Sequence, residues 1–296
     1  MGMYIAGIDV GATNLKFGIF DEAGEMVHMR VVRSIQGNPE DTAAQIDGLI
    51  REAPVRAEMI GVGVPGTVFM PSGLVYSGNL KWPGVKFAEM LSQITSLPVW
   101  LDNDAQAALA AETLPGGACF GVENAVYLTL GTGVGGALLI GGKPWRGHDN
   151  SGAELGHFIT HAGGLKCGCG MYGCFEMYAS AGALYRMSGG VRARSVIDRA
   201  RAGDEKMKRA LHTYAREVAN GVCSLYMIFR PQAIVLGGGV SAAGDILKKE
   251  ILSTVRPAYN FSRDDIAAVL RFAVMGNNAG MAGAAALARM NMSRIL

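Results

Sequence analysis

The chain has 296 residues, 50% of them are hydrophobic, and its formal net charge at pH 7 is +2. This length and composition supply enough core for two domains or one large one, and so small a charge gives nucleic acid no electrostatic footprint. Glycine or charged residues interrupt every hydrophobic stretch before it reaches the roughly twenty residues of a membrane span, and residues 1–9 lack the pattern of a signal peptide. We therefore expect a globular protein of enzyme size in the cytoplasm.

The amino-terminal residues predict three antiparallel strands joined by tight turns. These strands are residues 3–11 (MYIAGIDVG), 15–20 (LKFGIF) and 26–33. The first turn carries the pattern Asp9-x-Gly11-x-Thr13. Backbone N–H groups and the Thr13 hydroxyl could meet phosphate oxygens there, while Asp9 faces a hydrated Mg²⁺ ion. By itself this pattern is weak, because glycine-containing hairpin turns are common.

Helices and strands then alternate, which predicts an α/β domain. Helical spacing covers residues 38–52, 87–96 and 105–112, and strands are predicted at 59–64 and 98–101. Residues 75–79 lead into a predicted loop at 80–83. The strand at 98–101 stops at Asp102-Asn103-Asp104, so polar groups gather at the carboxyl end of a strand, where open α/β sheets bind ligands.

A strand–turn–strand pattern recurs beyond the glycine-rich residues 115–121, where we place a domain boundary. Residues 125–130 and 134–140 predict strands, and Gly131-Thr132-Gly133 predicts the turn between them. Two such units in one chain indicate a duplicated domain with a nucleotide cleft between its halves.

A histidine and three cysteines lie close together near the middle of the chain. His157 precedes Cys167, Cys169 and Cys174, a Cys₃His set of the kind that closes a tetrahedron around structural Zn²⁺. Glycines between them let the short chain fold back on one ion. A disulfide or scattered core thiols are the alternative, but Cys167 and Cys169 are too close in sequence to pair comfortably. Few cysteines outside the cluster agree with a reducing compartment.

Two glutamates flank this cluster. Glu154 lies in the sequence AELGH, and Glu176 follows the last cysteine by two residues. Carboxylates accept the paired hydroxyls of a sugar well, and a metal clamp is a rigid way to orient them. The alternative is that both are ordinary solvated glutamates.

The carboxyl-terminal part returns to alternating elements. Helices are predicted at 176–187, 195–202, 204–229 and 243–255, and strands at 233–236 and 267–274. The strand at 233–236 ends in Gly237-Gly238-Gly239. Such glycines can bring backbone against a base or a phosphate, although close packing explains them more often. A helix at 281–294 closes the chain.

These motifs together resemble the ROK sugar kinases, within the superfamily of actin, hexokinase and heat-shock-chaperone ATPases. The resemblance spans nearly the whole chain, and the cysteine motif with its upstream Gly-His is its specific part. The landmarks are Asp9-Val-Gly-Ala-Thr13, Gly63-Val-Pro-Gly66, Asn79-Leu80, Asn103-Asp104-Ala105, Gly131-Thr-Gly-Val-Gly-Gly136, Glu154-Leu-Gly-His157, Cys167-Gly-Cys-Gly-x-x-Gly-Cys174-x-Glu176 and Gly237-Gly-Gly239. Ala12 stands where the family usually has a second glycine, and Phe175 replaces a usual aliphatic residue.

The resemblance implies an α/β, duplicated ribonuclease H-like fold of the actin-like ATPase type, with two domains and an interdomain cleft. The first domain would cover residues 1–115, and a helix at about 281–296 would pack back on it. The second would cover 116–280 and contain the zinc-clamped loop 152–176. Relatives of this kind are commonly dimers or tetramers, so a homodimer or homotetramer is expected.

The resemblance also implies ATP-dependent phosphorylation of a hexose hydroxyl, with Mg²⁺ at the nucleotide and structural Zn²⁺ in the clamp. Asp104 would be the catalytic base. The residues implied at the sugar are Gly66, Asn79, Asn103, Asp104, Glu154, His157 and Glu176. The residues implied at the nucleotide are Asp9, Gly11, Ala12, Thr13, Asn14, Gly131, Thr132, Gly133, Gly135, Gly238 and Gly239. The zinc ligands would be His157, Cys167, Cys169 and Cys174.

Two aspartates compete for the role of base. A free aspartate has a pKa of about 3.9, so a carboxylate orients a sugar hydroxyl and accepts its proton late in the reaction. Asp102 lies two residues before Asp104 on the same predicted strand and would share its face. The resemblance favours Asp104, because the family's base follows the asparagine directly.

Other classes of function are less consistent with the sequence. Repressors of the family carry a helix-turn-helix domain ahead of the ATP motif, which here starts at Asp9, and actin or chaperone ATPases have no reason to carry a Cys₃His clamp. We expect sugar and ATP as partners and no nucleic acid or membrane. Residues 78–82 and 85–91 resemble the glucokinase branch, so glucose, at its 6-hydroxyl, is the expected substrate. N-acetylmannosamine, N-acetylglucosamine, fructose and allose stay open, as does a sugar-binding regulator.

The zinc clamp and the nucleotide loops are separate in sequence. Residues 9–13 and 131–136 lie outside the clamped segment. We therefore expect a Cys169→Ser substitution to impair sugar binding and turnover together and to leave nucleotide binding intact.

Overall fold

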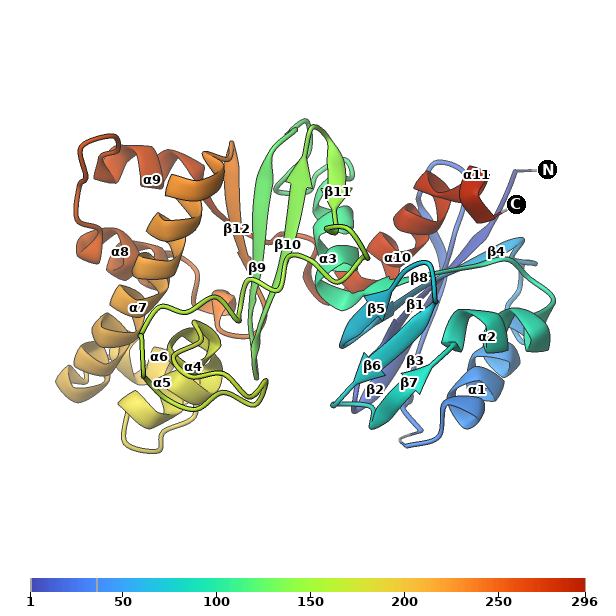
Figure 1. Ribbon diagram of the computed structural model, residues 1–296, viewed down its shortest axis with the longest axis horizontal. Helices are drawn as coiled ribbons and strands as arrows, with labels where there is room; N and C mark the ends of the chain where they lie inside the picture. Colours follow the sequence, from blue (N-terminus) through green and yellow to red (C-terminus); the bar gives the residue numbers. More distant parts are fainter. Residues whose placement is uncertain (1, 36, 296) are drawn as a thin grey trace. The chain divides into compact units, whose positions relative to one another are not determined.

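The computed structural model describes residues 2–35 and 37–295, and its internal contacts divide the chain into two compact units (Figure 1). The first contains Met1–Phe120, Pro144–Gly152 and Val274–Leu296, and the second contains Gly121–Lys143 and Ala153–Ala273. Met1, Gln36 and Leu296, which the predicted domain ranges include, lie outside the described residues. Within the described ranges, every helix is too short or too polar to cross a membrane.

A five-stranded sheet with the order β3-β2-β1-β4-β8 forms the centre of the first unit. Its strands are β1 (Ile5–Val10), β2 (Asn14–Phe20), β3 (Met26–Arg33), β4 (Met59–Val64) and β8 (Val99–Asn103). β2 is antiparallel to both β1 and β3, whereas β1, β4 and β8 are parallel. The three antiparallel strands predicted at the amino terminus are confirmed, and the strand predicted at 98–101 runs on to Asn103.

Alternate residues of β1 face two different helical layers. Ala6 and Ile8 belong to a core shared with α1 (Pro39–Arg51) and α2 (Phe87–Thr95). Ile5, on the opposite face, belongs to a core shared with α3 (Asp104–Glu112) and α10 (Ala279–Met290). The helix α11 (Met292–Ile295) follows α10. The sheet is therefore covered on both faces, as a parallel sheet requires.

Glycines allow α10 to lie directly on the strands. A Cβ atom at Gly61 would lie 2.0 Å from the carbonyl oxygen of Ala284, and a Cβ atom at Gly7 would lie 2.2 Å from that of Met281. No side chain fits at these points, so the backbone of the helix contacts the backbone of β1 and β4. This close approach brings the start of α10 to the edge of the sheet that carries Asp9.

We expect Gly61→Ala to lower the free energy of unfolding by about 3 kcal/mol, because the added methyl group collides with backbone that no side-chain rotation can move. Gly48 on α1 is the matched control, since a Cβ atom there meets no described atom within 4 Å. Gly48→Ala should raise the stability by about 0.5–1 kcal/mol. Urea unfolding measures both values, and equal stabilities for the two variants would contradict the close packing of α10.

Three short strands between β4 and α2 form a separate sheet, β5-β6-β7. They are β5 (Thr67–Phe69), β6 (Leu74–Ser77) and β7 (Trp82–Val85). The predicted loop at 80–83 is therefore wrong at Trp82 and Pro83. Trp82 pairs with Ser77 and is buried, with its ring centroid 4.6 Å from that of Phe87. Proline fits in β7 because this strand lies at the edge of its sheet.

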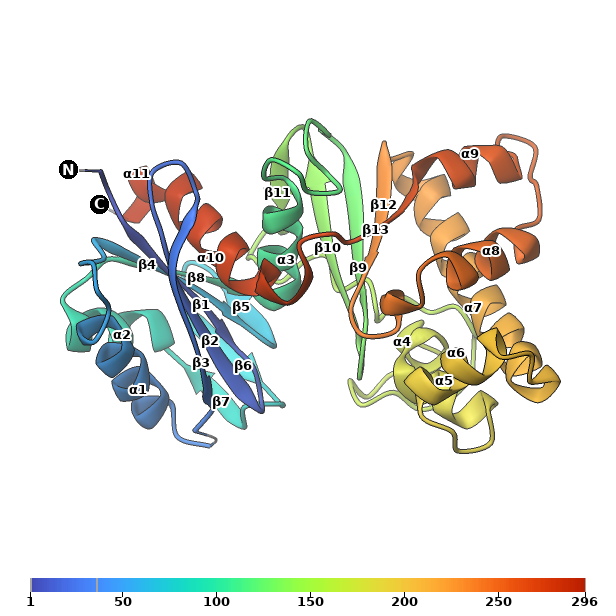
Figure 2. The same ribbon diagram turned by 180° about the vertical axis from the view of Figure 1, so that it is seen from behind.

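A second sheet repeats the arrangement of the first, with the order β11-β10-β9-β12-β13, and its strands β9, β10, β12 and β13 lie in the second unit. Its strands are β9 (Ala125–Leu130), β10 (Val134–Ile140), β11 (Lys143–Trp145), β12 (Ala233–Gly237) and β13 (Leu270–Phe272). β9 is antiparallel to β10 and parallel to β12, and β13 extends the parallel part beside β12 (Figure 2). The same strand order in both sheets, with matching directions from the second strand of each order to the fifth, confirms the predicted duplication.

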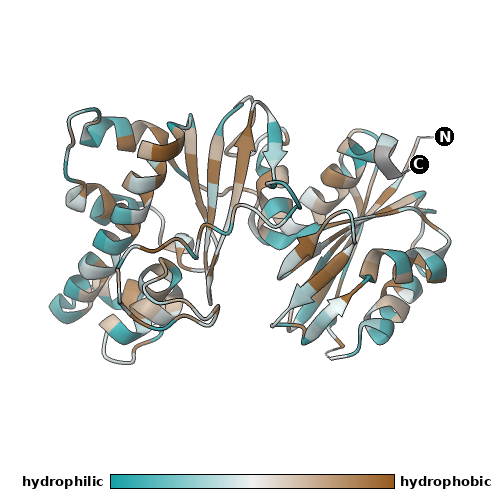
Figure 3. Ribbon diagram, in the orientation of Figure 1, coloured by the Kyte–Doolittle hydropathy of each residue, from teal (hydrophilic) through white to brown (hydrophobic). Residues whose placement is uncertain are grey.

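Helices pack on this second sheet through one large core. They are α4 (Glu176–Ala179), α5 (Ala181–Met187), α6 (Ala193–Arg201), α7 (Glu205–Phe229), α8 (Asp245–Thr254) and α9 (Arg263–Val269). Asp204 caps the longest of them, α7, by accepting the N–H groups of Lys206 and Met207. Figure 3 shows hydrophobic residues concentrated in the strands, whereas the helices alternate between hydrophobic and hydrophilic residues, as amphipathic helices do.

Two predicted elements of the second unit need correction. The helix predicted at 176–187 is interrupted at Ser180, whose extended backbone (ψ 167°) ends α4 and whose hydroxyl caps α5. The strand predicted at 267–274 is reduced to β13, because a capping box between Ser262 and Asp265 starts a helix that runs to Val269. Local capping thus overrides the apolar pattern in the second case.

Glu112, the last residue of α3, is fully buried and accepts three backbone N–H groups. Its Oε1 accepts from Val274 and Met275 at 3.0 Å each, and its Oε2 accepts from Ala118 at 2.8 Å. Ala118 lies just before the chain first leaves the first unit, and Val274 is where the chain returns to it for the second time. One carboxylate therefore fixes both of these passages.

Candidate active site

Several predicted site residues lie at one edge of the first sheet, where three parallel strands end. Asp9 pairs in register with Gly63, and Val64 pairs with Asn103. Neighbouring parallel strands end at the same edge of a sheet. This edge therefore brings together Asp9 near the end of β1, the Gly66 loop after β4, and Asn103 at the end of β8. The sequence-based expectation of polar groups at the end of β8 is confirmed.

Asn103 fixes the junction between β8 and α3. Its Oδ1 accepts the N–H groups of Ala105 (2.8 Å) and Gln106 (3.3 Å), which makes it the N-cap of α3. Its Nδ2 donates to the carbonyl oxygen of Gly66 at 2.7 Å. Asn103 therefore holds the Gly66 loop against the start of α3, in addition to the sugar contact predicted for it.

Asp104 is the first residue of α3, and its side chain is exposed. Its Oδ1 accepts the N–H of Ala105 at 2.8 Å. A carboxylate is favoured at a helix N-terminus, because the unpaired N–H groups and the helix dipole attract negative charge. The predicted base is therefore a solvent-accessible anion at a fixed point of the sheet edge.

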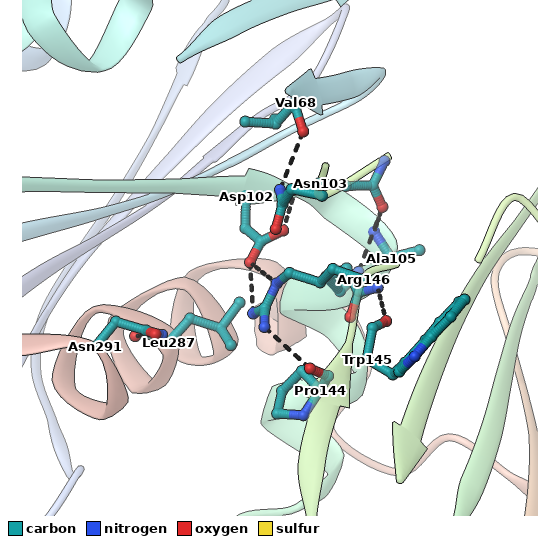
Figure 4. Close-up of polar contacts among 11 residues, drawn as sticks. Val68, Asp102, Asn103, Ala105, Pro144, Trp145, Arg146, Leu287 and Asn291 are labelled. Carbon is teal, nitrogen blue, oxygen red and sulfur yellow. Dashed lines mark hydrogen bonds and ion pairs between the residues drawn. The ribbon is translucent and has the colours of Figure 1, made fainter. Parts of the chain in front are cut away.

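Asp102 has a different environment, although it lies only two residues earlier. Its side chain is 1% exposed, and its Oδ2 lies 2.7 Å from Nε and 2.6 Å from Nη2 of Arg146 (Figure 4). The Nε contact is an aligned hydrogen bond, whereas the Nη2 contact is an ion-pair approach. Arg146 is a site residue that the sequence analysis missed, because a single arginine in a polar stretch gives no pattern.

Asp9 is also held by a residue that was missed. Its Oδ2 accepts from Nζ of Lys16 at 3.0 Å, and Lys16 also donates to the carbonyl oxygen of Asn277 at 2.9 Å. Asp9 and Lys16 are paired across β1 and β2. The single lysine in the otherwise uncharged strand sequence NLKFGIF could therefore have predicted a charged partner for Asp9. The carboxylate also faces the start of α10, since a Cβ atom at Gly280 would lie 2.5 Å from the Cγ of Asp9.

The turn after β1 places the remaining predicted nucleotide residues of the first unit. The N–H of Gly11 donates to the carbonyl oxygen of Asn14 at 3.0 Å, which closes a tight turn through Ala12 and Thr13. Ser34 holds the turn from β3, since its N–H donates to Thr13 and its hydroxyl to Gly11. Thr13 and Asn14 are exposed.

The other predicted sugar residues of the first unit border the small sheet. Gly66 has a φ of 126° and packs against Tyr76, where a Cβ atom would lie 2.2 Å from the carbonyl oxygen. Any larger residue would be strained at this position and would also collide with β6. Asn79 is exposed in the turn between β6 and β7.

Two glycine turns lie side by side in the second unit, at the ends of the parallel strands β9 and β12. The N–H of Val240 donates to the carbonyl oxygen of Leu130 at 2.9 Å, and a Cβ atom at Gly238 would lie 2.6 Å from that oxygen. In the β9–β10 turn, Gly131 donates to Gly133 and Gly135 donates to Oγ1 of Thr129, both at 3.0 Å. Thr132, Gly238 and Gly239 are exposed, so backbone N–H groups are accessible there.

The predicted zinc ligands of the second unit converge. The ligand atoms of His157, Cys167, Cys169 and Cys174 all lie within 4.8 Å of one another. Sγ of Cys169 is 3.6 Å from Sγ of Cys174, and Sγ of Cys167 is 3.6 Å from Nδ1 of His157. A tetrahedral zinc site with a Zn–S distance of about 2.3 Å requires ligand separations of about 3.6–3.8 Å. The donor set therefore fits Zn²⁺, and the sulfur separation excludes a disulfide between Cys169 and Cys174.

The pKa values of the three thiols are shifted in different directions because their environments differ. Burial raises the pKa of Cys167, and it raises the pKa of Cys174 to about 12. The pKa of Cys169 is lowered, chiefly by a hydrogen bond from the backbone of Met171. A cation among these thiols would favour their thiolate forms, so metal binding here is coupled to proton release.

Glu176 links the cysteine cluster to the β9–β10 turn. Its Oε2 accepts the N–H of Val134 at 3.0 Å, and a Cβ atom at Gly133 would lie 2.3 Å from that oxygen. Its Oε1 lies 3.7 Å from Sγ of Cys167. The other predicted glutamate, Glu154, is exposed, and its carbonyl oxygen accepts the N–H of His157 at 2.9 Å. The zinc clamp and the predicted nucleotide turn, expected from the sequence to be separate, are therefore in contact through Glu176.

Comparisons with known proteins cover nearly the whole chain. A family model described as "ROK family" matches residues 5–291. A glucokinase from Streptomyces coelicolor is 33% identical over 98% of this chain and 98% of its own, and an N-acetylmannosamine kinase from Shigella flexneri is 32% identical over 97% and 99%. A crystal structure of a ROK family glucokinase from Streptomyces griseus, in complex with glucose and AMPPNP, superposes with a TM-score of 0.83 at 29% identity, covering 98% of this chain and 100% of that chain.

Proposed function

The chain belongs to the ROK family, and from this membership we propose that it phosphorylates glucose at the 6-hydroxyl with ATP as donor and Asp104 as general base. Its similarity to glucokinases along both chains makes it an ATP-dependent hexose kinase with the actin-like ATPase fold predicted from the sequence. The choice of glucose and the roles of individual residues are the proposal.

One observation carries the assignment of the base. Asp104 and Asp102 are the two carboxylates at the end of β8, and they differ in burial: Asp102 is buried against Arg146, whereas Asp104 is exposed. A base must reach the proton that it accepts, so a carboxylate enclosed by a guanidinium is a poor candidate. Asp104 is exposed at the edge where Asp9 and the Gly66 loop also lie.

Asp104 does not need to deprotonate the sugar hydroxyl before phosphoryl transfer begins. A carboxylate is a far weaker base than an alkoxide, so it orients the hydroxyl in the ground state and takes the proton as the bond to phosphorus forms. The proton moves from the sugar oxygen to the Asp104 carboxylate, and the γ-phosphoryl group moves from ATP to the sugar oxygen, with ADP as the leaving group. Orientation of the attacking oxygen then provides much of the rate enhancement.

The nucleotide is proposed to contact glycine turns of both units. In the first, the turn at Gly11, Ala12, Thr13 and Asn14 offers backbone N–H groups and a hydroxyl, and in the second the turns at Gly131–Gly135 and Gly238–Gly239 do the same. Asp9 supplies the carboxylate oxygen that Mg²⁺ prefers, with Lys16 beside it. Mg²⁺ bound with ATP would neutralise charge on the phosphate oxygens.

Zinc is proposed to be structural, because all four positions of the tetrahedron would be taken by His157, Cys167, Cys169 and Cys174. With Nδ1 of His157 toward the cluster, the opposite ring nitrogen can donate to a sugar hydroxyl. Glu154 and Glu176 are proposed to accept from further hydroxyls. Gly66, Asn79 and Asn103 are the proposed sugar contacts of the first unit.

The substrate proposal is tested by measuring ADP release with glucose, mannose, fructose, allose, N-acetylglucosamine and N-acetylmannosamine at saturating MgATP. We expect kcat/KM for glucose to exceed the others by about tenfold or more, the scale on which a pocket separates similar sugars. A matched control is 6-deoxyglucose, which should compete with glucose and release no ADP.

A highest kcat/KM for N-acetylmannosamine would replace glucose by an acylamino sugar and keep the kinase assignment. ADP release with 6-deoxyglucose at the glucose rate would contradict transfer to the 6-hydroxyl. The proposed substrate and the proposed position of transfer are thus tested separately.

A further inference from the structure

We propose that Asp102 and Arg146 form a positioning pair for Asp104, so that turnover depends on an ion pair that touches neither substrate. The inference rests on the proposed role of Asp104 as base. Its starting point is the exposure of the two side chains: Asp102 is 1% exposed and Arg146 is 14% exposed. A carboxylate buried to this degree needs an opposite charge beside it and hydrogen-bond donors for both of its oxygens.

The Asp102 carboxylate receives contacts on both oxygens. Arg146 takes Oδ2 with two of its nitrogens, and the backbone N–H of Asn103 donates to Oδ1 at 2.9 Å. The carboxylate therefore ties the guanidinium directly to the backbone N–H of Asn103, the residue that precedes Asp104. Any rotation of the Asp102 side chain would move or release the Asn103 N–H.

Asn103 transmits this constraint to the base. Its side chain caps α3 through Ala105 and holds the carbonyl oxygen of Gly66. Asp104 lies between Asn103 and Ala105, and its own carboxylate accepts the Ala105 N–H. The direction of the Asp104 side chain is therefore set by a chain of bonds that runs from Arg146 through Asp102 and Asn103 to Ala105. Figure 4 shows these four residues.

Arg146 is itself fixed, because residues 144–152 are anchored at several points within the first unit. Nη1 of Arg146 donates to the carbonyl oxygen of Pro144 at 3.2 Å, and Gln106 of α3 donates to that of Trp145 at 3.2 Å. Further along, Asn150 donates to the carbonyl oxygen of Val68 and Asp149 accepts the N–H of Met70. The guanidinium thus contacts Asp102 from a segment whose backbone is held in place by several hydrogen bonds.

The geometry points to catalysis more than to stability. A buried ion pair contributes little net stability compared with apolar residues of the same size, because desolvation offsets the attraction. An attacking oxygen misplaced by about 1 Å can cost about a hundredfold in rate. A pair of this kind is therefore better explained by the precision that it gives to Asp104.

The test compares Asp102→Asn, Arg146→Gln, Arg146→Lys and the double variant Asp102→Asn/Arg146→Gln. We expect kcat per glucose-binding site to fall about tenfold to a hundredfold in Asp102→Asn and Arg146→Gln, with the glucose KM changed less than threefold. The double variant should lose no more than the worse single variant, because both substitutions break one interaction. Arg146→Lys should recover part of the loss, since lysine keeps the charge and loses the second donor.

The control is Arg51→Gln, which breaks the Asp47–Arg51 pair on α1 in the same unit, where the Arg51 side chain is 72% exposed, and should leave kcat unchanged. Glucose binding, measured directly, counts the folded sites and removes any effect of partial unfolding. Single variants with kcat within twofold of the parent, or losses that multiply in the double variant, would overturn the positioning pair. The premise is checked by Asp104→Asn: if that variant keeps turnover, the proposed base fails, whereas if it alone is inactive, only the positioning pair fails.

Discussion

Asp104→Asn is expected to lower kcat by about a thousandfold while the affinity for glucose changes less than about fivefold. The amide keeps the shape of the carboxylate and can still orient a hydroxyl, but it cannot accept the proton. The loss should therefore fall on kcat rather than on binding, the signature of an interaction made only in the transition state. Steady-state kinetics and direct glucose titration of the same preparation measure the two quantities.

Asp245 supplies the matched control. It is the first residue of α8, as Asp104 is of α3, and it is exposed in the same way. Asp245→Asn removes the same favourable charge at a helix N-terminus, so it corrects for any effect of helix stability. Turnover of Asp104→Asn within tenfold of the parent would exclude this residue as the base.

Cys169→Ser is expected to remove the zinc and to lower both glucose affinity and turnover by about a hundredfold. Cys169 is exposed, so the substitution leaves the buried packing of Cys167 and Cys174 in place and the loss is attributable to the metal. His157 and Glu176 would lose the support that fixes their direction. Metal analysis, expected to give one zinc per parent chain and less in the variant, is paired with titrations of glucose and of an ATP analogue.

The link through Glu176 predicts a smaller effect on the nucleotide. Glu176 accepts the N–H of Val134 in the β9–β10 turn, and one such bond contributes about 1 kcal/mol, or about fivefold in affinity. Cys223→Ser on α7, outside the cluster, is the matched control and should bind zinc and both substrates like the parent. Lost nucleotide binding with retained glucose binding would assign the cluster to the wrong ligand.

Acid should release the metal in the parent protein. Without metal, burial holds the pKa of Cys174 at about 12 and raises that of Cys167, so these thiols are protonated at neutral pH and zinc must displace their protons. Zinc affinity therefore rises with pH and falls as the solution is acidified. Glucose binding should be lost over the same pH range as the zinc.

Long periodic elements and the cysteine spacing could be predicted from the sequence, because each reflects a local rule. Strand β4 was predicted at its observed residues, and α1 begins where Asn38 and Pro39 indicate. The strands β5 to β7 have only three or four residues, which is too few for a period to be recognised. These strands form through pairing with one another, which their individual sequences do not show.

The candidate site residues also divide into those that a local sequence pattern predicts and those that only the folded structure brings together. The zinc ligands could be inferred because the fold brings together residues already close in sequence. Arg146 could not, since it meets Asp102 across 44 positions and lies in a segment with no apolar pattern. The contact between Glu176 and Val134 likewise joins residues 42 positions apart, and no single-sequence rule relates them.

The buried Glu112 makes the two connections at Ala118 and Val274 depend on each other. Both passages of the backbone are held by one carboxylate at the last turn of α3. Fraying of that turn would release them in a single event, so they belong to one cooperative opening unit despite their distance in sequence. Two covalent connections that look independent along the chain therefore share one point of local unfolding.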